Sequence, residues 1–403
     1  MRHRIKALSL AAGVVLLAAA CTETSTAPEG TDRLVEKPRV AADRDLQAGS
    51  SVAWNRTAQQ LIVNRLVVAV QLQSRILTYL SLAQYNAVVA AERANDRDRR
   101  ASEAAAAAGA SVVVLTSFFP ADAAFLEALL DAQFPANPHG GRRNKDALAR
   151  GEEIGRAVGA NVVAYAAGDN FNVLIPPPAP IGPGYWTSSA NPPAPSVRSL
   201  YGTRPFFLRS GDQFRPPPPP PFGSPEFLAA LAEIRAISDT RTAEQVAQAQ
   251  LWAPRGPAYM NEVAVGLIES HGRGERRTAH ILALANMAAF DAQIGCFDAK
   301  FAYWFIRPTK ADPAITLAIP LPNHPSYISG HSCITASYAA VLSQAFPRET
   351  ARLDAMVVAA GLSRMYGGLH YRFDITAGQE LGRRVAGWAI AHDVRWHRPF
   401  PLD

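Results

Sequence analysis

Long segments rich in Ala and Leu, with apolar residues at helical spacing, constrain this chain more than any other feature. They recur along most of its 403 residues, and neither strand-like alternation nor a repeat of fixed period interrupts them. With 48% hydrophobic residues the chain can bury a large core, which excludes a disordered or fibrous protein. We predict an all-α protein, a bundle of about ten to fourteen helices. The helical segments are 58–92, 101–116, 121–133, 144–167, 225–251, 257–271, 276–297, 332–346 and 375–392.

One proline-rich segment breaks this pattern. Residues 176–225 hold 16 of the 31 prolines, and neither a helix nor a central strand can pass through them. The segment is either a flexible linker or an ordered loop. Its aromatic residues favour the loop, because a solvated linker does not need them. We predict one domain, 50–403, in which this loop joins a helical N-terminal half, 50–175, to a C-terminal half, 226–403. The aromatic residues are Tyr185, Trp186, Tyr201, Phe206, Phe207 and Phe214.

The N-terminus is typical of an export signal. Three basic residues among the first six precede an uncharged stretch, 7–20, which ends in three Ala before Cys21. The stretch is too short to span a bilayer and predicts a cleaved signal peptide, 1–20. Small residues before a Cys resemble a bacterial lipoprotein signal. This implies lipidation of Cys21, a tether over 21–49, and a periplasmic or cell-surface protein that meets the membrane only through its lipid. The alternative is an ordinary secreted protein with an incidental Cys.

The charge balance argues against a nucleic-acid partner. Lys and Arg total 40 against 34 Asp and Glu, and the net charge of +6 is spread along the chain without a basic run. Three Cys are too few for a disulfide scaffold. Cys296 and Cys333 flank the motifs described next. In an oxidising compartment they form either a disulfide or, as we predict, two free buried thiols.

Two cations stand within an aromatic segment. Lys300 and Arg307 are separated by residues that include Phe, Tyr and Trp, and Pro308 follows directly. The spacing corresponds to about two helical turns, so both cations are predicted on one face of a helix that Pro308 ends. Cations in an apolar segment need an anionic partner. That partner is either a bound anion or an internal carboxylate, Asp291 or Asp298.

A Ser-Gly-His turn directly precedes the apolar segment 332–346. Ser329, Gly330 and His331 would then stand at a helix N-terminus, where free backbone N–H groups and the helix dipole favour an oxyanion. Ser329 adds a hydroxyl donor, and Gly330 allows a ligand to approach the backbone. The alternative is a plain N-cap, with Ser329 capping the helix and His331 satisfied at the surface.

A third motif joins Arg, His and Asp across a glycine break. Gly367 and Gly368 separate Arg364 from His370, so the two side chains can converge from different backbone geometries. Asp374 lies four residues after His370, where its carboxylate would hold the imidazole by a hydrogen bond. The alternative is a helix–loop–helix joint with a chance His.

Together the three motifs resemble the superfamily of vanadium-dependent haloperoxidases and type 2 phosphatidic acid phosphatases. Their order is Lys-x6-Arg-Pro, Ser-Gly-His and Ser-Arg-x5-His-x3-Asp. The resemblance implies an all-helical fold with one pocket for vanadate or phosphate, since vanadate resembles the transition state of phosphoryl transfer. One residue departs from the pattern: Ile328 stands where the superfamily usually has Pro. The implied roles are oxyanion binding by Lys300, Arg307, Ser329, Gly330 and Arg364, acid–base catalysis by His331, and axial ligation of vanadium or attack on phosphorus by His370, with Asp374 beside it.

His324 favours one of the superfamily's activities over the other. The sequence His324-Pro-Ser-Tyr is similar to the bromoperoxidase form of the second motif, unless His324 is a structural residue near the pocket. The resemblance then implies a vanadate-dependent haloperoxidase that oxidises halide, bromide in preference, with hydrogen peroxide. One alternative is a phosphomonoester or lipid phosphatase without a cofactor, in which His370 is the nucleophile and His331 the acid. Another is a non-catalytic phosphate-binding lipoprotein, which would not need both histidines.

Overall fold

The computed structural model describes residues 49–64, 69–95, 100–134, 141–171, 173–188, 194–394 and 398–402. Within these ranges the chain forms thirteen α-helices and no strand, so the predicted all-α class is confirmed. An isolated backbone bridge joins Tyr185 to Phe305. The predicted signal peptide, Cys21 and the predicted tether before Gly49 lie outside the described residues.

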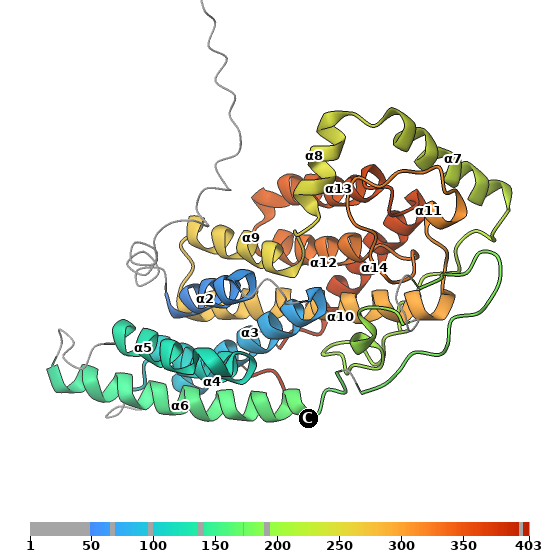
Figure 1. Ribbon diagram of the computed structural model, residues 1–403. Helices are drawn as coiled ribbons and strands as arrows, with labels where there is room; N and C mark the ends of the chain where they lie inside the picture. Colours follow the sequence, from blue (N-terminus) through green and yellow to red (C-terminus); the bar gives the residue numbers. More distant parts are fainter. Residues whose placement is uncertain are drawn as a thin grey trace, which may run out of the picture. The chain divides into compact units, whose positions relative to one another are not determined.

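The helices follow one another as Figure 1 shows: α2 (Ser50–Asn64), α3 (Val70–Arg93), α4 (Glu103–Phe118), α5 (Ala123–Gln133), α6 (Gly141–Ala167), α7 (Pro225–Thr240), α8 (Ala243–Trp252), α9 (Pro257–Ser270), α10 (Glu275–Tyr303), α11 (Pro308–Ala311), α12 (Gly330–Ala345), α13 (Thr350–Tyr366) and α14 (Arg372–Ala391). Two predicted segments are each divided into two helices. The segment 58–92 contributes to α2 and α3, and 225–251 forms α7 and α8, because Thr242 starts α8 with a capping box. The segment of α13 is not among the predicted helices.

α3 is buried on nearly every side, which makes it the centre of the N-terminal half. All residues from 76 to 89 are buried. α4 and α6 pack against it, and α10 covers it from the C-terminal half. Neither α3 nor any other described helix is long and apolar enough to cross a membrane.

A row of glycines brings α4 and α6 into backbone contact. Gly151, Gly155 and Gly159 recur every fourth residue of α6 and face α4. A Cβ added at Gly155 would lie 2.1 Å from the carbonyl oxygen of Ala106, a distance that no side chain tolerates. The small residues therefore set the separation of the two helices, and larger ones would force them apart.

α10 takes part in several hydrophobic cores. One side of its first half, including Ala283 and Met287, packs with α2 to α6, and other residues of this half pack with α9 and α12. From Phe290 onward it packs with the proline-rich loop, α12 and α14. α14 in turn lies directly on the first turn of α12, where a Cβ added at Gly378 would lie 2.7 Å from the Ser329 carbonyl oxygen. This close packing fixes the N-terminus of α12.

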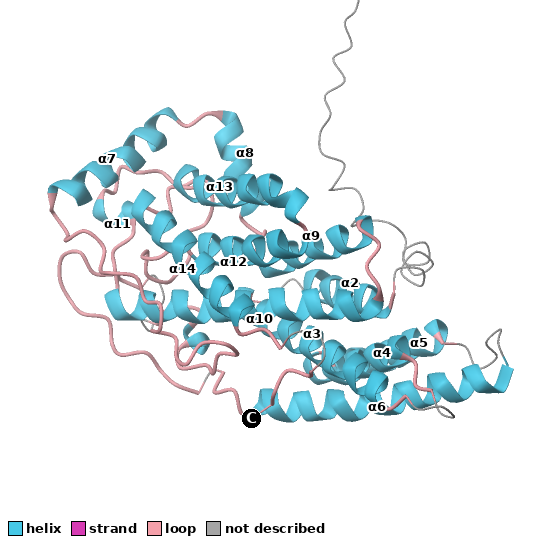
Figure 2. Cartoon of the chain, turned by 180° about the vertical axis from the view of Figure 1, so that it is seen from behind, coloured by secondary structure: helices cyan, strands magenta, loops and turns pink. Residues whose placement is uncertain are grey.

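Over its described residues, 176–188 and 194–225, the proline-rich segment is an ordered loop, as its aromatic residues predict. Near the middle of the loop, the backbone N–H groups of residues 206, 207 and 208 donate to the buried carboxylate of Asp291 at 2.7–3.1 Å. The hydroxyls of Tyr303 and Tyr327 donate to the carbonyl oxygens of Pro216 and Pro217 at 2.6 and 2.8 Å. Figure 2 shows the loop on the side of the molecule where α10 ends. The loop therefore lies over the region that holds the three motifs.

Candidate functional site

Lys300 and Arg307 belong to one site but not to one helical face. The prediction that a single helix carries both and ends at Pro308 is wrong. α10 ends at Tyr303, because Trp304 takes a left-handed φ of 48°. Arg307 is the N-cap of the short α11, in which Pro308 is the first residue. The chain bends between the two cations, and they reach the site from different backbone segments.

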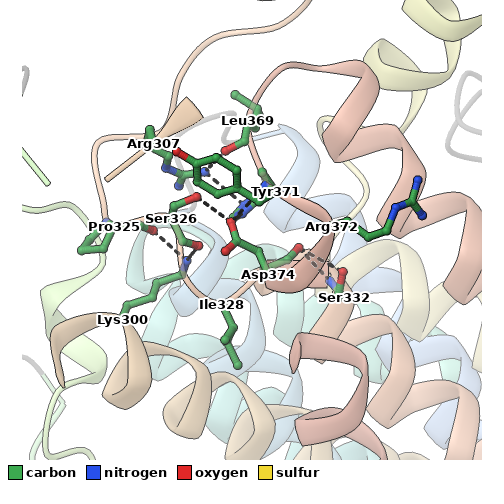
Figure 3. Close-up of polar contacts among 12 residues, drawn as sticks. Lys300, Arg307, Pro325, Ser326, Ile328, Ser332, Leu369, Tyr371, Arg372 and Asp374 are labelled. Atoms are coloured by element: carbon green, nitrogen blue, oxygen red, sulfur yellow. Dashed lines mark hydrogen bonds and ion pairs between the residues drawn. The ribbon is translucent and has the colours of Figure 1, made fainter. Parts of the chain in front are cut away.

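The ammonium group of Lys300 is fully buried. Its Nζ donates to the carbonyl oxygens of Pro325 and Ser326 at 2.8 and 2.9 Å, as Figure 3 shows. Both acceptors are neutral, so they satisfy the hydrogen bonds of the ammonium but not its charge. Burial lowers the pKa of Lys300 to about 8.

Arg307 lies at the centre of the site and is also buried. Its guanidinium donates to the carbonyl oxygens of His324 (3.0 Å) and Leu369 (2.8 Å). It also donates to the imidazole nitrogens of His370 (Nε2, 3.1 Å) and His324 (Nδ1, 3.0 Å). Burial lowers the pKa of Arg307 to about 10. The guanidinium thereby joins the second and third motifs.

Arg364 supplies a third buried cation from the last turn of α13. It donates to Ser363 Oγ (3.0 Å) and to the carbonyl oxygen of Ala249 on α8 (3.1 Å). Burial, together with the charge of Arg307, lowers the pKa of Arg364 to about 10.

No internal carboxylate bonds to these three cations among the described residues. Of the two predicted candidates, Asp291 accepts the loop N–H groups and Asp298 pairs with Arg215 at 2.6 Å, so that alternative is wrong. The carboxylate that interacts with the cations is Asp374. Three cations and one carboxylate leave an excess of two positive charges in a buried site. Such an excess is stable only when an anion compensates for it.

Asp374 holds His370 in a defined orientation. Its Oδ2 lies 2.8 Å from His370 Nδ1 and accepts a hydrogen bond from Ser326 Oγ at 2.5 Å. Figure 3 shows Asp374 turned toward Ser326, whereas Arg372 points away. Burial raises the pKa of Asp374 to about 6, although Ser326 and the nearby cations act in the opposite direction. The carboxylate is thus ionised at neutral pH.

The partners of His370 also determine its tautomer. A guanidinium can only donate, so Nε2 accepts from Arg307 and carries a lone pair. Nδ1 carries the proton and donates to Asp374. Burial and the charges of Arg307 and Lys300 hold the pKa of His370 well below its usual range, so the ring stays neutral. The lone pair of His370 therefore lies among cations, where Arg307 donates to it until a ligand replaces this hydrogen bond.

The Ser-Gly-His turn forms the N-terminus of α12, as predicted. Ser329 is the N-cap, and its Oγ accepts hydrogen bonds from the backbone N–H (3.4 Å) and hydroxyl (3.0 Å) of Ser332. This is the capping arrangement of the alternative prediction, and it leaves the Ser329 hydroxyl proton for a further acceptor. The Ser329 N–H donates to the Asp374 carbonyl oxygen at 3.0 Å. Gly330 is the first residue of the helix and is partly exposed.

His331 and His324 lie on the rim of this cluster. His331 Nε2 is 3.0 Å from the carbonyl oxygen of Trp252, so Nε2 carries the proton and Nδ1 the lone pair. Burial and the charge of Arg364 lower its pKa to about 3. The His324 ring packs edge-on against Phe297, with centroids 5.2 Å apart. Both imidazoles are partly exposed, unlike the three cations.

Sequence reasoning missed several contributors. Ser326, inside the second motif, bridges Lys300 and Asp374 through its carbonyl and hydroxyl groups. The backbone carbonyls of Ala249, Trp252 and Pro325 also bind site residues. Ser326 could have been found from the sequence, because its hydroxyl group lies between His324 and the Ser-Gly-His turn. Backbone carbonyls carry no signal, because every residue has one.

Comparison with known families agrees with this geometry. Residues 279–398 match the model of the PAP2 superfamily, and this range contains all three motifs. The match confirms the resemblance predicted from those motifs. No curated protein sequence matches the chain.

Solved structures share the fold over most of the chain. A bacterial vanadium-dependent iodoperoxidase aligns with 21% identity and a TM-score of 0.71, over 87% of this chain and 96% of that one. Two bacterial vanadium-dependent chloroperoxidase structures, apo and holo, align with 16% and 15% identity and TM-scores of 0.63 and 0.61. They cover 80% of this chain, and 93% and 91% of their own. The helical bundle is therefore the fold of vanadium haloperoxidases.

Proposed function

We propose that the protein is a vanadate-dependent haloperoxidase that oxidises halide, bromide in preference, with hydrogen peroxide. The excess of buried positive charge around the neutral Nε2 of His370 is the observation that carries this proposal. A site of this kind suits an oxyanion that also accepts a nitrogen lone pair. Vanadate has both properties, and the neighbouring structures are named as vanadium-dependent enzymes.

The residues present fit vanadate. Lys300, Arg307 and Arg364 would hold its oxygens, helped by the Ser329 hydroxyl and the Gly330 N–H. His370 Nε2 would be its protein ligand, because Nδ1 is committed to Asp374. When bound, vanadium supplies Lewis acidity toward the peroxide without changing its own oxidation state.

The chain's own groups perform the remaining tasks. Asp374 and Ser326 orient His370, and the buried cations lower the cost of placing negative charge there. His331 has its lone-pair nitrogen, Nδ1, available to take or return a proton, because Nε2 donates to the Trp252 carbonyl. His324 lies on the partly exposed rim and reaches the centre through Arg307. It is therefore our candidate for tuning halide oxidation.

Phosphate-ester hydrolysis is the second candidate, since the same geometry supports it. An oriented, neutral His370 backed by Asp374 is also a nucleophile for phosphorus. His331 would then have to donate a proton. A bound anion would raise its pKa of about 3, as it would in the haloperoxidase, so this value does not separate the two activities. We place this activity second because the solved structures that share the fold are named as vanadium-dependent enzymes, and we place non-catalytic phosphate binding third.

A paired assay on protein lacking residues 1–21 tests the proposal. One half is loaded with orthovanadate and given bromide, hydrogen peroxide and a phenol acceptor. The other half, free of vanadate, receives a chromogenic phosphomonoester. We expect vanadate-dependent bromination that H370A abolishes and that H392A, which changes an exposed histidine at the end of α14, leaves intact. Ester hydrolysis that vanadate inhibits, without bromination, would overturn the proposal in favour of the phosphatase. Vanadate binding without either activity would favour the third candidate.

A further inference from the structure

Two buried cysteines lie directly behind the oxyanion site. Cys296 is on α10, one turn before Lys300, and Cys333 is on the first turn of α12, two residues after His331. Both side chains are fully buried, and both thiols are free. The proposed function uses neither of them. Their helices are close neighbours, and both helices supply site residues.

Both sulfurs lie beneath the Ser-Gly-His turn. The Cys296 thiol donates to the Ile328 carbonyl oxygen at 3.7 Å, and a Cβ added at Gly330 would lie 4.0 Å from the Cys296 sulfur. Cys333 Sγ would lie 3.4 Å from a Cβ added at Gly378 on α14. Only Gly330, which has no side chain, would therefore separate the Cys296 sulfur from an oxyanion bound at this turn.

The surroundings make Cys296 the more nucleophilic of the two. Burial raises the pKa of its thiol, but the Cys333 thiol, as hydrogen-bond donor, and the Lys300 ammonium more than offset this and lower it. Burial raises the pKa of Cys333 well above its usual range, and the neighbouring Cys296 adds to the effect. A thiolate stabilised by a second thiol and a cation is the arrangement found in reactive cysteine pairs.

We propose that Cys296 and Cys333 form a peroxide-oxidised dithiol that closes to an intramolecular disulfide between α10 and α12. The Cys296 thiolate attacks one oxygen of hydrogen peroxide, the O–O bond breaks, and hydroxide leaves with the sulfenic acid formed. The Cys333 sulfur then attacks the sulfenic sulfur. Its proton goes to the departing hydroxide, so the two thiols are oxidised and one peroxide is reduced to two waters.

This inference rests on the proposed function for the supply of oxidant, because a haloperoxidase must admit hydrogen peroxide to this site. Gly330 is partly exposed, and it separates that peroxide from Cys296. An anion bound in the site would lie between the incoming peroxide and Cys296. Phosphate is therefore expected to slow the oxidation of the pair.

The test uses reduced protein lacking residues 1–21, in which Cys296 and Cys333 are the remaining cysteines of the three in the chain. It is exposed to hydrogen peroxide without vanadate, denatured, treated with N-ethylmaleimide and weighed intact. We expect a monomer that has lost two hydrogens, takes up no maleimide and recovers both thiols with dithiothreitol. Saturating phosphate should slow the oxidation of the two thiols by about tenfold or more, as expected when access to the thiolate controls the rate.

Single variants assign the order of attack. C333S should give a sulfenic acid at Cys296 that dimedone traps, whereas C296S should leave Cys333 unoxidised under the same conditions. Persistence of both thiols in the wild-type protein, a disulfide-linked dimer, or oxidation that phosphate does not slow would each overturn the inference. The mass readout needs no turnover, so it is separate from the paired assay. Oxidation of the pair without bromination defeats the proposed function alone, and bromination with two intact thiols defeats this inference alone.

Discussion

A buried ammonium group that donates only to carbonyl oxygens destabilises a protein as long as no anion is present. Lys300 is in this position. In the unfolded chain its pKa is near the ordinary value of 10.5, and in the folded protein it is about 8. Between these values the unfolded chain holds a proton that the folded protein has lost. The free energy of unfolding of the empty protein therefore rises with pH across this window. Lys300 destabilises the folded protein most below pH 8, where it is charged.

For K300M we accordingly expect a higher melting temperature of the empty protein at pH 7 and a weaker rise of stability between pH 8 and 10. The same change should weaken phosphate binding by about ten- to a hundredfold, the worth of a hydrogen bond to a charged group. Melting curves and calorimetric titration with phosphate measure the two effects. K310M, at an exposed lysine on α11, is the matched control. A destabilised K300M protein with unchanged affinity would contradict the assignment.

D374N keeps the size of the side chain but removes the charge that holds His370. The His370 imidazole then loses the carboxylate that keeps the proton on Nδ1. We expect the turnover number to fall by about 10²–10⁴-fold, as in other histidine–aspartate pairs, while the affinity for the anion changes much less. The comparison of kcat with vanadate affinity tests this split. E380Q, an exposed change on α14, should alter neither.

The chemistry-bearing side chains of the site could be predicted from the motifs, but their partners could not. Charged and imidazole side chains are rare in apolar segments, so they can be recognised in the sequence. This holds for Lys300, Arg307, Arg364 and His370. The carbonyl oxygens that bind the cations belong to residues such as Ala249, whose type says nothing about this contact. The alternative that Asp291 or Asp298 pairs with the cations could not be decided from the sequence, because distance in sequence does not reveal which way a helical residue faces.

At the scale of the helices, the contact between α14 and α12 positions the Ser-Gly-His turn. G378A would place a methyl group 2.7 Å from the Ser329 carbonyl oxygen and push the two helices apart. We expect a loss of about 1–3 kcal/mol of stability, together with weaker phosphate binding. G387A, on the same helix with open space around it, should be neutral or slightly stabilising. Denaturant unfolding and phosphate titration of both variants distinguish a local from a general effect.

The attachment of the proline-rich loop depends on one carboxylate. D291A leaves the N–H groups of residues 206–208 without their acceptor, at a cost of about 1–3 kcal/mol for each that stays buried. We expect faster limited proteolysis within 209–221 and a lower melting temperature. D298N, which removes the partly exposed pair with Arg215, should have a much smaller effect. Equal proteolysis of the two variants would show that Asp291 is not the anchor.

Most helix positions could be predicted from periodicity, although α13 was missed, whereas helix ends depended on tertiary contacts. Apolar spacing placed α10, but it could not show that the helix stops at Tyr303. The reason is the left-handed conformation of Trp304, which a bulky residue adopts only when the surrounding structure holds it. The Trp304 carbonyl oxygen accepts a hydrogen bond from the backbone of Trp186, more than a hundred residues earlier. The residues near Trp304 in the sequence therefore cannot predict this contact.

At the scale of the whole molecule, the charge excess of the site makes stability depend on the anion supplied. We expect phosphate or vanadate to bind the folded protein and not the unfolded chain. At a hundred times its dissociation constant either should add about 2.7 kcal/mol. We expect the melting temperature to rise with the logarithm of phosphate concentration and not with chloride at equal ionic strength. A melting temperature that is indifferent to phosphate would argue against an anion site.

The burial of α3 on all sides has a consequence for biosynthesis. Its cover from α10 is complete only when the chain has grown past Met287, roughly 200 residues after Arg93, which takes about 10–40 s at ordinary rates of translation. Until then one apolar flank of α3 faces solvent in the nascent chain. The N-terminal half therefore cannot complete its folding before the first half of α10 has been made. Until then α3 is a binding site for a chaperone that holds apolar helices.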